Sequence, residues 1–204
     1  MLQHPAAVRD AFEQGAITFL DVLRAVPSDQ WDKPGALGTM TTRELAAHTL
    51  RAFVTIEGYL VAEPQTDRVL ADAGEYYIAA LSDPNVHDGV ANRARQAGRQ
   101  LIDPVGEAEV TVARVLALVA ATANDDPVNT FLGQMTLSEY LATRVVELGV
   151  HTLDLARATD QPAELHSDTA GVVLSVLTQL ASPTQLILAF TGRQSLPADY
   201  NLLR

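Results

Sequence analysis

One stretch of the chain carries five polar side chains spaced three or four residues apart. They are Tyr140, Arg144, Glu147, His151 and Asp154. On an α-helix, which has about 3.6 residues per turn, this spacing places all five on one narrow line. Leucine and valine flank the line, at positions 137, 141, 145, 148 and 155 on one side and 146, 150 and 153 on the other. We therefore predict that the polar line faces the interior of the protein.

Burial of this line brings together a carboxylate and an imidazole, which is costly unless a bound cation compensates both groups. Glu147 and His151 are four residues apart, so their ligand atoms reach the same point beside the helix. Paired residues on one helix of a zinc enzyme share an ion in this way. We predict that Glu147 and His151 bind a divalent metal, with a third ligand from another helix.

His48 is the candidate for the third ligand, because it alone among the remaining histidines lies mid-helix beside an apolar stripe. The others, His4, His87 and His166, lie in predicted loops or near predicted ends. Two histidines and one carboxylate leave coordination positions open for water or substrate, as catalytic sites do. Such a set accepts nickel, iron or manganese as well as zinc, which is our first choice. A helix-surface pair is the alternative interpretation of Glu147 and His151.

Arg144 and Asp154 are candidate catalytic residues beside the metal. Asp154, one turn after His151, could orient the imidazole or bind a polar group of a cosubstrate. Arg144 could pair with Glu147 or with a substrate carboxylate. The alternative for both residues is an ion pair that supports the fold.

The helices that must position these residues are indicated by apolar side chains at helical spacing. We predict helices at 6–26, 42–60, 105–123, 137–158, 169–180 and 184–190, shorter ones near 67–81 and 86–101, and a loop at 28–38. Thr41 and Glu44 fit a capping box before the helix with His48. Strand-length alternating runs do not recur, so we predict one all-α domain over residues 1–204: a four-helix bundle with long crossover connections and extra short helices.

Composition narrows the class of protein. The 204 residues are 48% hydrophobic and 19% charged, which is typical of a globular protein, and the net charge of −11 disfavours nucleic acid and anionic lipid as partners. Because there is no cysteine, thiol chemistry would need a sulfur brought by a substrate. No apolar stretch approaches the roughly 20 residues that cross a bilayer, and no signal-peptide pattern is present, so we expect a cytoplasmic protein.

Two segments resemble motifs of a known family: Glu44-Leu-Ala-Ala-His48, and the stretch from Arg144 to Asp154 with Glu147 and His151. The family is that of mycothiol-dependent maleylpyruvate isomerases, in the DinB-like superfamily, and the resemblance extends over nearly the whole chain. It implies a bundle of four main helices with zinc or another divalent ion bound by a histidine of the second helix and a glutamate and histidine of a later one. Gly192-Arg193 followed by Leu196-Pro197 is similar to the family's C-terminal ending, which implies a cofactor-binding role for Arg193; capping of the preceding helix is the alternative.

The resemblance also implies thiol chemistry. Short members of the family look like mycothiol-dependent transferases or proteins of unassigned substrate, so maleylpyruvate itself is not implied as the substrate. We predict a metal-dependent transferase or isomerase in which the metal holds mycothiol as the thiolate that attacks a small electrophile. The alternatives are a non-catalytic bundle that binds a metal or small molecule, and a metal-free interaction scaffold that could form a homodimer through an apolar helix face.

Overall fold

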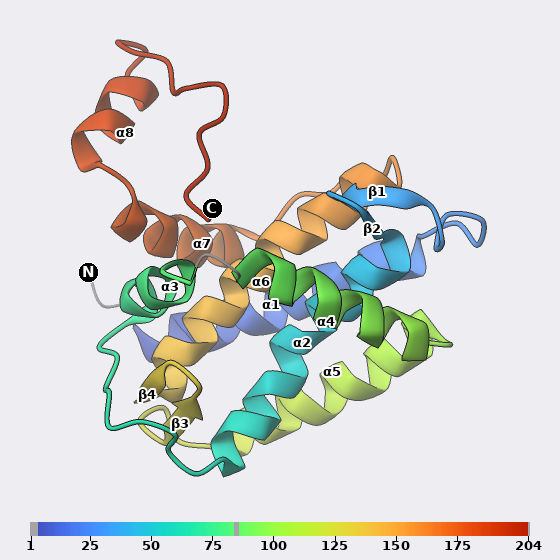
Figure 1. The fold of residues 1–204 in the computed structure, drawn as a ribbon, viewed down its shortest axis with the longest axis horizontal. Helices are drawn as coiled ribbons and strands as arrows, with labels where there is room; N and C mark the ends of the chain where they lie inside the picture. The colour runs from blue at the N-terminus through green and yellow to red at the C-terminus, as the bar shows by residue number, and fades with distance from the viewer. Residues whose placement is uncertain (1–3, 84–85, 204) are drawn as a thin grey trace.

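The structure, a computed structural model, describes residues 4–83 and 86–203, apart from the side chains of residues 86–88. The described residues form eight helices and two short hairpins (Figure 1). The helices are α1 (Pro5–Arg24), α2 (Thr42–Val61), α3 (Ala73–Leu81), α4 (Val86–Gln100), α5 (Pro104–Ala121), α6 (Leu137–Ala158), α7 (Ser167–Leu180) and α8 (Pro183–Phe190). The hairpins pair β1 (Pro34–Leu37) with β2 (Met40–Thr41) and β3 (Pro127–Thr130) with β4 (Gly133–Thr136). The prediction of a mainly helical protein is confirmed.

Four of the helices form a bundle in which α1 packs on α5 and α6, and α2 packs on the same two helices. The long connection from α2 to α5 contains α3, which packs on α6, and α4, which packs on α2. Helix α7 covers α1 and α6, whereas α8 projects away from the bundle (Figure 1). This arrangement agrees with the predicted bundle with a long crossover. None of the described helices is both long enough and apolar enough to cross a membrane.

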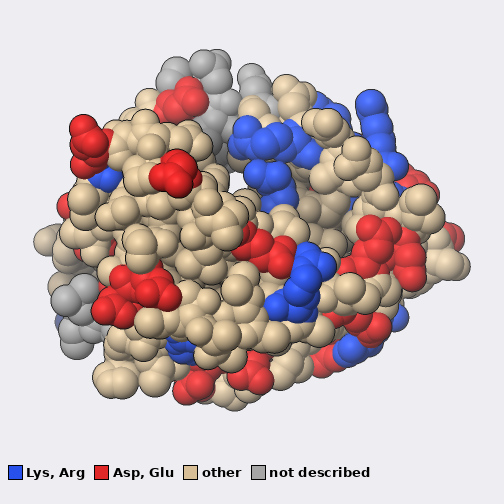
Figure 2. Space-filling view, turned by 90° about the horizontal axis from the view of Figure 1, so that it is seen from below, with Lys and Arg blue, Asp and Glu red and all other residues tan. Residues whose placement is uncertain are grey.

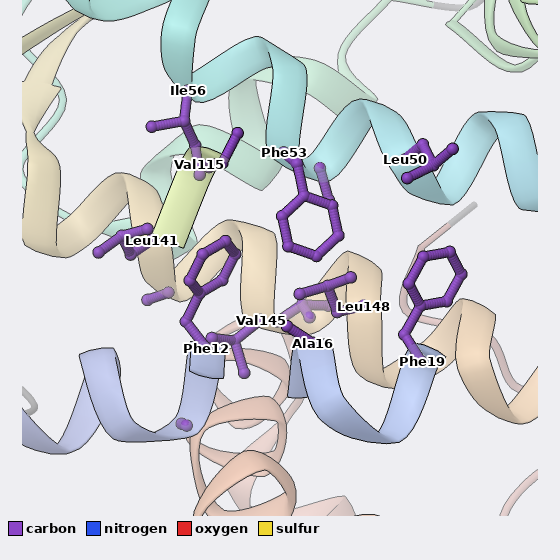
Figure 3. Close-up of a cluster of buried hydrophobic side chains, with 14 of the residues drawn as sticks. Phe12, Ala16, Phe19, Leu50, Phe53, Ile56, Val115, Leu141, Val145 and Leu148 are labelled. Carbon is purple, nitrogen blue, oxygen red and sulfur yellow. The ribbon is translucent and has the colours of Figure 1, made fainter. Parts of the chain in front are cut away.

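The core between α1, α2 and α6 is built from large side chains of all three helices (Figure 3). The rings of Phe12 and Phe53 have centroids 5.3 Å apart, and those of Phe19 and Phe53 are 6.2 Å apart. Leu141 and Leu148 of α6 are fully buried against them. Burial of each such side chain stabilises the fold by about 1.5–3 kcal/mol. The core therefore fixes the separation of α2 and α6, the two helices that carry the predicted ligands.

Hydrogen bonds at the helix starts fix where α2 and α6 begin. The Thr41 hydroxyl accepts from the Glu44 backbone N–H at 3.2 Å, and the Glu44 carboxylate accepts from the Thr41 N–H at 2.9 Å, which confirms the predicted capping box. At the start of α6 the Thr136 hydroxyl accepts from the Glu139 N–H at 3.3 Å. A fixed start determines which face of each helix a later residue such as His48 occupies.

The two hairpins were not expected from the sequence, and residues 34–37 of β1 lie within a predicted loop. The β3–β4 hairpin buries polar residues, Asn129 and Thr130, together with the apolar pair Val128 and Met135. The Asn129 amide donates to the Ala62 carbonyl at 2.7 Å, and the Thr130 hydroxyl donates to the Gly133 carbonyl at 2.7 Å. Each strand has only four residues, and three consecutive residues of β3 are buried, so the long alternating run that predicts a strand is missing.

Candidate metal site

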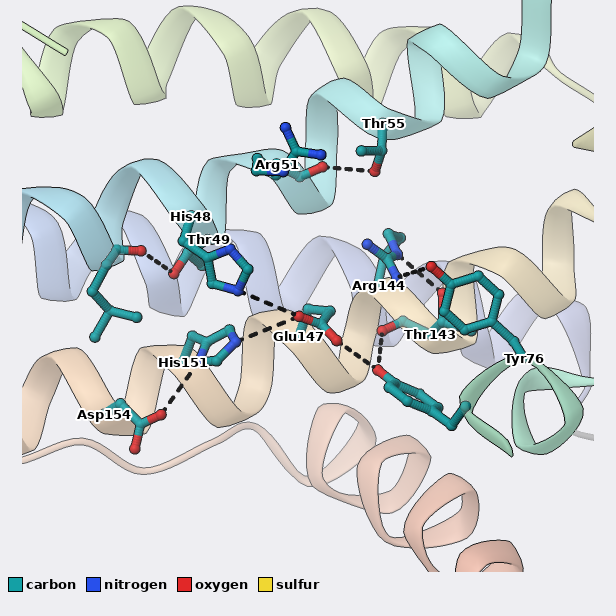
Figure 4. Close-up of polar contacts among 12 residues, drawn as sticks. His48, Thr49, Arg51, Thr55, Tyr76, Thr143, Arg144, Glu147, His151 and Asp154 are labelled. Atoms are coloured by element: carbon teal, nitrogen blue, oxygen red, sulfur yellow. Dashed lines mark hydrogen bonds and ion pairs between the residues drawn. The ribbon is translucent and has the colours of Figure 1, made fainter. Parts of the chain in front are cut away.

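Helices α2 and α6 bring the three predicted ligands to one point inside the bundle (Figure 4). Nε2 of His151 lies 3.4 Å from Oε2 of Glu147, and Nε2 of His48 lies 3.9 Å from the same oxygen. One ligand atom from each residue lies within 4.8 Å of the other two. Ligands about 2.1 Å from a tetrahedral ion are roughly 3.4 Å apart, so a small inward shift of the side chains would complete three bonds. The donor set and its geometry therefore fit a divalent metal.

The three ligand side chains are largely shielded from water, with 12% of His48, 23% of Glu147 and 13% of His151 exposed. Burial and the nearby charge of His151 lower the pKa of His48 to about 4, so its imidazole is neutral near pH 7. A neutral imidazole is the form that binds a metal. The buried Nδ1 atom of His48 has no hydrogen-bond partner among the described residues.

Glu147 and His151 form a charged pair in the metal-free protein. Burial alone would raise the pKa of Glu147, but the hydrogen bond with His151 and the charge of Arg144 lower it overall, so the carboxylate is ionised. Burial alone would lower the pKa of His151, but hydrogen bonds with Asp154 and Glu147 raise it to about 9. The site therefore holds one proton on His151 at neutral pH, and a metal would have to displace it.

Asp154 lies where the orienting role would place it. Its Oδ2 atom is 3.3 Å from Nδ1 of His151, which leaves Nε2 of that ring facing Glu147 (Figure 4). Histidines that bind metals commonly donate their second ring N–H to a carboxylate in this way. The pair therefore fixes both the tautomer and the direction of the ligand nitrogen.

Tyr77 is a residue of the site that the sequence did not indicate. Its hydroxyl lies 2.9 Å from Oε1 of Glu147 and 3.1 Å from the Thr143 carbonyl oxygen. Burial and the charge of Glu147 raise the pKa of Tyr77 well above its usual value, so the hydroxyl keeps its proton and donates it. This bond occupies one oxygen of Glu147 and leaves Oε2 facing the two histidines.

Helix α3 carries Tyr77 to the site. It is tied to α6 where the Ala73 N–H donates to the Glu139 carboxylate at 3.3 Å. Tyr77 and Glu147 are 70 positions apart, so no local spacing connects them. The adjacent pair of tyrosines at 76 and 77 in a short helix is the only signal that could have drawn notice.

Arg144 lies beside the ligands but forms no hydrogen bond or ion pair with Glu147, one of its two expected partners. Its Nε donates to the Thr143 hydroxyl at 3.0 Å, and its Nη2 donates to the Tyr76 hydroxyl at 3.5 Å. The guanidinium lies 4.8 Å from the centre of the Tyr140 ring. Aromatic rings thus lie against this buried cation, and the Glu147 carboxylate acts on it by charge without a hydrogen bond or ion pair.

The structure does not bring Arg193 to the three ligands. Arg193 follows α8, where its exposed guanidinium donates to the Thr191 carbonyl at 3.2 Å beside a cavity of about 420 Å³ formed by residues 189–196. Of the other histidines, His4 and His166 cap the starts of α1 and α7. The side chain of His87 lies outside the described residues. These positions add no further described ligand to the site.

Comparison with protein families gives a match over most of the chain. The model of the family described as mycothiol maleylpyruvate isomerase N-terminal domain matches residues 12–156. No curated protein and no solved structure matches the chain. The matched range ends near the end of α6 and includes all three candidate ligands and Asp154, whereas α7, α8 and Arg193 lie beyond it.

Proposed function

Because the chain belongs to the family of mycothiol maleylpyruvate isomerase N-terminal domains, and so to the DinB-like metal-binding superfamily, we propose that it is a metal-dependent enzyme. Its reaction is the attack of a thiol, mycothiol, on a small electrophile, in a transfer or an isomerisation. The observation that carries this proposal is the convergence of His48, Glu147 and His151 inside the bundle. The chain has no cysteine of its own, so the sulfur comes from the cosubstrate.

The number of ligands favours catalysis over a purely structural metal. Among the described side chains the group consists of three residues, and the nearby carboxylate of Asp154 is engaged by His151. Structural zinc sites have four protein ligands, whereas catalytic sites have three and leave a position open. This site therefore has room for a sulfur atom next to its protein ligands.

The residues around the site prepare it for an anionic sulfur. A divalent ion bound there would lower the pKa of a coordinated thiol and hold it as thiolate, the form that attacks electrophiles. Glu147 supplies the only negative charge among the three ligands, so the loaded site as a whole attracts an anion. The Asp154 carboxylate accepts a hydrogen bond from Nδ1 of His151, and the Tyr77 hydroxyl donates one to the carboxylate of Glu147. The thiol loses its proton to water, and a sulfur lone pair forms the bond to the electrophilic carbon. In a transfer the leaving group departs with the electrons of its own bond to that carbon, and in an isomerisation the carbon–sulfur bond breaks again and releases the thiol.

Metal analysis of ligand variants tests the proposed site. Protein purified without chelators should contain close to one equivalent of a divalent metal, and His48→Ala and His151→Ala should lose most of it. His166→Ala is the matched control, because His166 is exposed and lies at the start of α7. Equal metal content in all variants would exclude this site.

Thiol consumption tests the activity. Metal-loaded protein should consume mycothiol in the presence of a set of electrophiles, and chelation should stop the reaction. A protein that binds the metal but consumes no thiol with any electrophile would be the non-catalytic metal-binding bundle instead. Consumption that continues at the same rate after the metal is removed would contradict the proposed mechanism.

A further inference from the structure

Helix α8 is rich in apolar residues but buries none of them. Ile187 and Phe190 lie three positions apart, so they share one face of the helix, and they are 62% and 72% exposed. Figure 1 shows that α8 projects from the bundle, and the Ser182 side chain makes no capping hydrogen bond at its start. Helices this short are marginal in water unless an apolar face is packed. This face of α8 therefore lacks the packing that would stabilise the helix.

Helix α7 presents a second exposed face, made of small and uncharged residues. Gly171, Leu174 and Thr178 are exposed, and their spacing places them on one side of the helix. A methyl group added at Gly171 would meet no described atom within 4 Å. Glycine inside a helix costs about 0.5–1 kcal/mol relative to alanine, and it allows another backbone to approach closely. The face is therefore suited to packing against a helix of another molecule.

The segment that contains these two faces is uncharged. Residues 169–192 include all of α8 and all of α7 except its first two residues, and they contain no Asp, Glu, Lys or Arg. The chain as a whole is 19% charged, with a net charge of −11, and Figure 2 shows acidic groups spread over one face beside a smaller group of basic ones. Two copies of such a chain repel each other on average. Contact through residues 169–192 brings no like charges together.

The size of the two helices indicates that they act together. A stable interface buries roughly 800 Å² of each partner. Helix α8 is only about 12 Å long, whereas α7 adds a further length of about 21 Å. A two-fold axis that places α8 of each copy on α7 of the other uses the same surface twice and covers both faces.

A membrane surface fits this segment less well than a second copy does. Helices that lie in a membrane interface carry Lys and Arg on their polar face, which anionic lipids attract. Neither α8 nor α7 has a basic residue. The absence of charge therefore favours contact with an equally uncharged protein surface.

We infer that the uncharged surface of α7 and α8 is a homodimer interface, in which Ile187 and Phe190 of one copy pack on the Gly171 and Leu174 face of the other. The sequence left open which apolar helix face a homodimer would use. This inference goes beyond the proposed function and does not depend on the metal site. The range matched by the family model ends at residue 156, before α7 begins.

Sedimentation velocity of the full chain over a concentration series tests the inference, because it gives the dissociation constant of the dimer. We expect the unmodified protein to dimerise at micromolar concentration. Phe190→Asp should weaken association on the order of 100-fold, because an aromatic side chain is lost from both halves of the interface. Phe131→Asp is the matched control, since Phe131 is 53% exposed and lies in the turn between β3 and β4. This control should dimerise as the unmodified protein does.

A second variant separates loss of the interface from loss of the fold. Gly171→Glu places its side chain in open space, and glutamate favours a helix more than glycine does. The variant should therefore keep its helical circular dichroism and sediment as a monomer, because it places a charge between the copies. Gly58→Glu is the matched control, since Gly58 is exposed on α2 and an added methyl there also meets no described atom within 4 Å.

Three results would overturn the inference. The first is an unmodified protein that remains a monomer throughout the concentration series. The second is a dimer that persists unchanged in both Phe190→Asp and Gly171→Glu, since another surface would then join the copies. The third is a monomer that binds phosphatidylcholine vesicles and loses this binding in Phe190→Asp, since α8 would then dock on a membrane. Dimerisation is expected with and without zinc, so the test holds even if the proposed metal site is wrong.

Discussion

Replacement of Tyr77 by phenylalanine should weaken metal binding without loss of the fold. The substitution keeps the buried ring and removes only the hydroxyl that donates to Oε1 of Glu147 at 2.9 Å. A hydrogen bond to a charged group contributes about 1.5–3 kcal/mol, which corresponds to roughly 10- to 150-fold in an equilibrium constant. Residues that hydrogen-bond a metal ligand without binding the metal themselves typically contribute about 10- to 100-fold to metal affinity. Two independent arguments therefore give the same range.

The measurement is competition for zinc between the protein and a chromogenic chelator near neutral pH. Tyr76→Phe is the matched control, since the Tyr76 hydroxyl is hydrogen-bonded to Arg144 and not to a ligand. We expect the control to bind zinc as the unmodified protein does and Tyr77→Phe to bind it at least tenfold more weakly, in line with the range for such residues. If folded Tyr77→Phe keeps full affinity for zinc, the hydrogen bond from Tyr77 does not orient the Glu147 carboxylate for metal binding, and the role given to Tyr77 is wrong.

Three further predictions concern the site and helix α6. Metal-free protein should lose stability as the pH rises from 6.5 to about 9, because His151 keeps its proton up to about pH 9 when folded but only up to 6.5 in the unfolded chain. Thermal unfolding checks this, and stability that increases over that range would contradict it. Asp154→Asn should weaken zinc binding by roughly 10- to 100-fold in the chelator competition, since the orientation of His151 is lost; unchanged affinity would argue against that role. Gly149→Ala should lower the free energy of unfolding by about 1–2 kcal/mol, because the new methyl would lie 2.8 Å from a methyl of Val173. Gly15→Ala, whose methyl meets nothing nearer than 3.5 Å, should raise the free energy of unfolding by up to about 1 kcal/mol. If urea unfolding shows that both variants change this free energy in the same direction, the comparison is refuted.

The sequence predicted those parts of the fold that depend on local spacing. The helices follow from apolar periodicity, and the capping box at Thr41 and Glu44 follows from two residues three positions apart. Glu147 and His151 lie four residues apart on one helix, so their common direction is a local property as well. His48 was assigned by its place in a second amphipathic helix and by the resemblance, and the bundle core then brings it to the same point.

The parts that sequence reasoning missed depend on contacts between distant segments. Tyr77 reaches Glu147 only because α3 docks on α6. The hairpin before α6 is held by hydrogen bonds of buried polar residues such as Asn129, and its four-residue strands are too short to show an alternating run. Arg144 was expected to have Glu147 as one of two partners, but side chains on a helix lean toward its N-terminus. The arginine therefore lies over the Tyr140 ring, one turn back, and not against Glu147.

The unpartnered Nδ1 atom of His48 sets this residue apart from the other two ligands. Glu147 is anchored by a tyrosine and His151 by an aspartate, whereas the His48 ring has no hydrogen bond at Nδ1 from a described residue and is packed against the His151 ring, with centroids 4.8 Å apart. If His48 adjusts its position while Glu147 and His151 stay in place, the same three ligands can bind ions of different radius. Capture of an ion would then begin on α6 and finish when the His48 side chain shifts inward, and release would run in the reverse order.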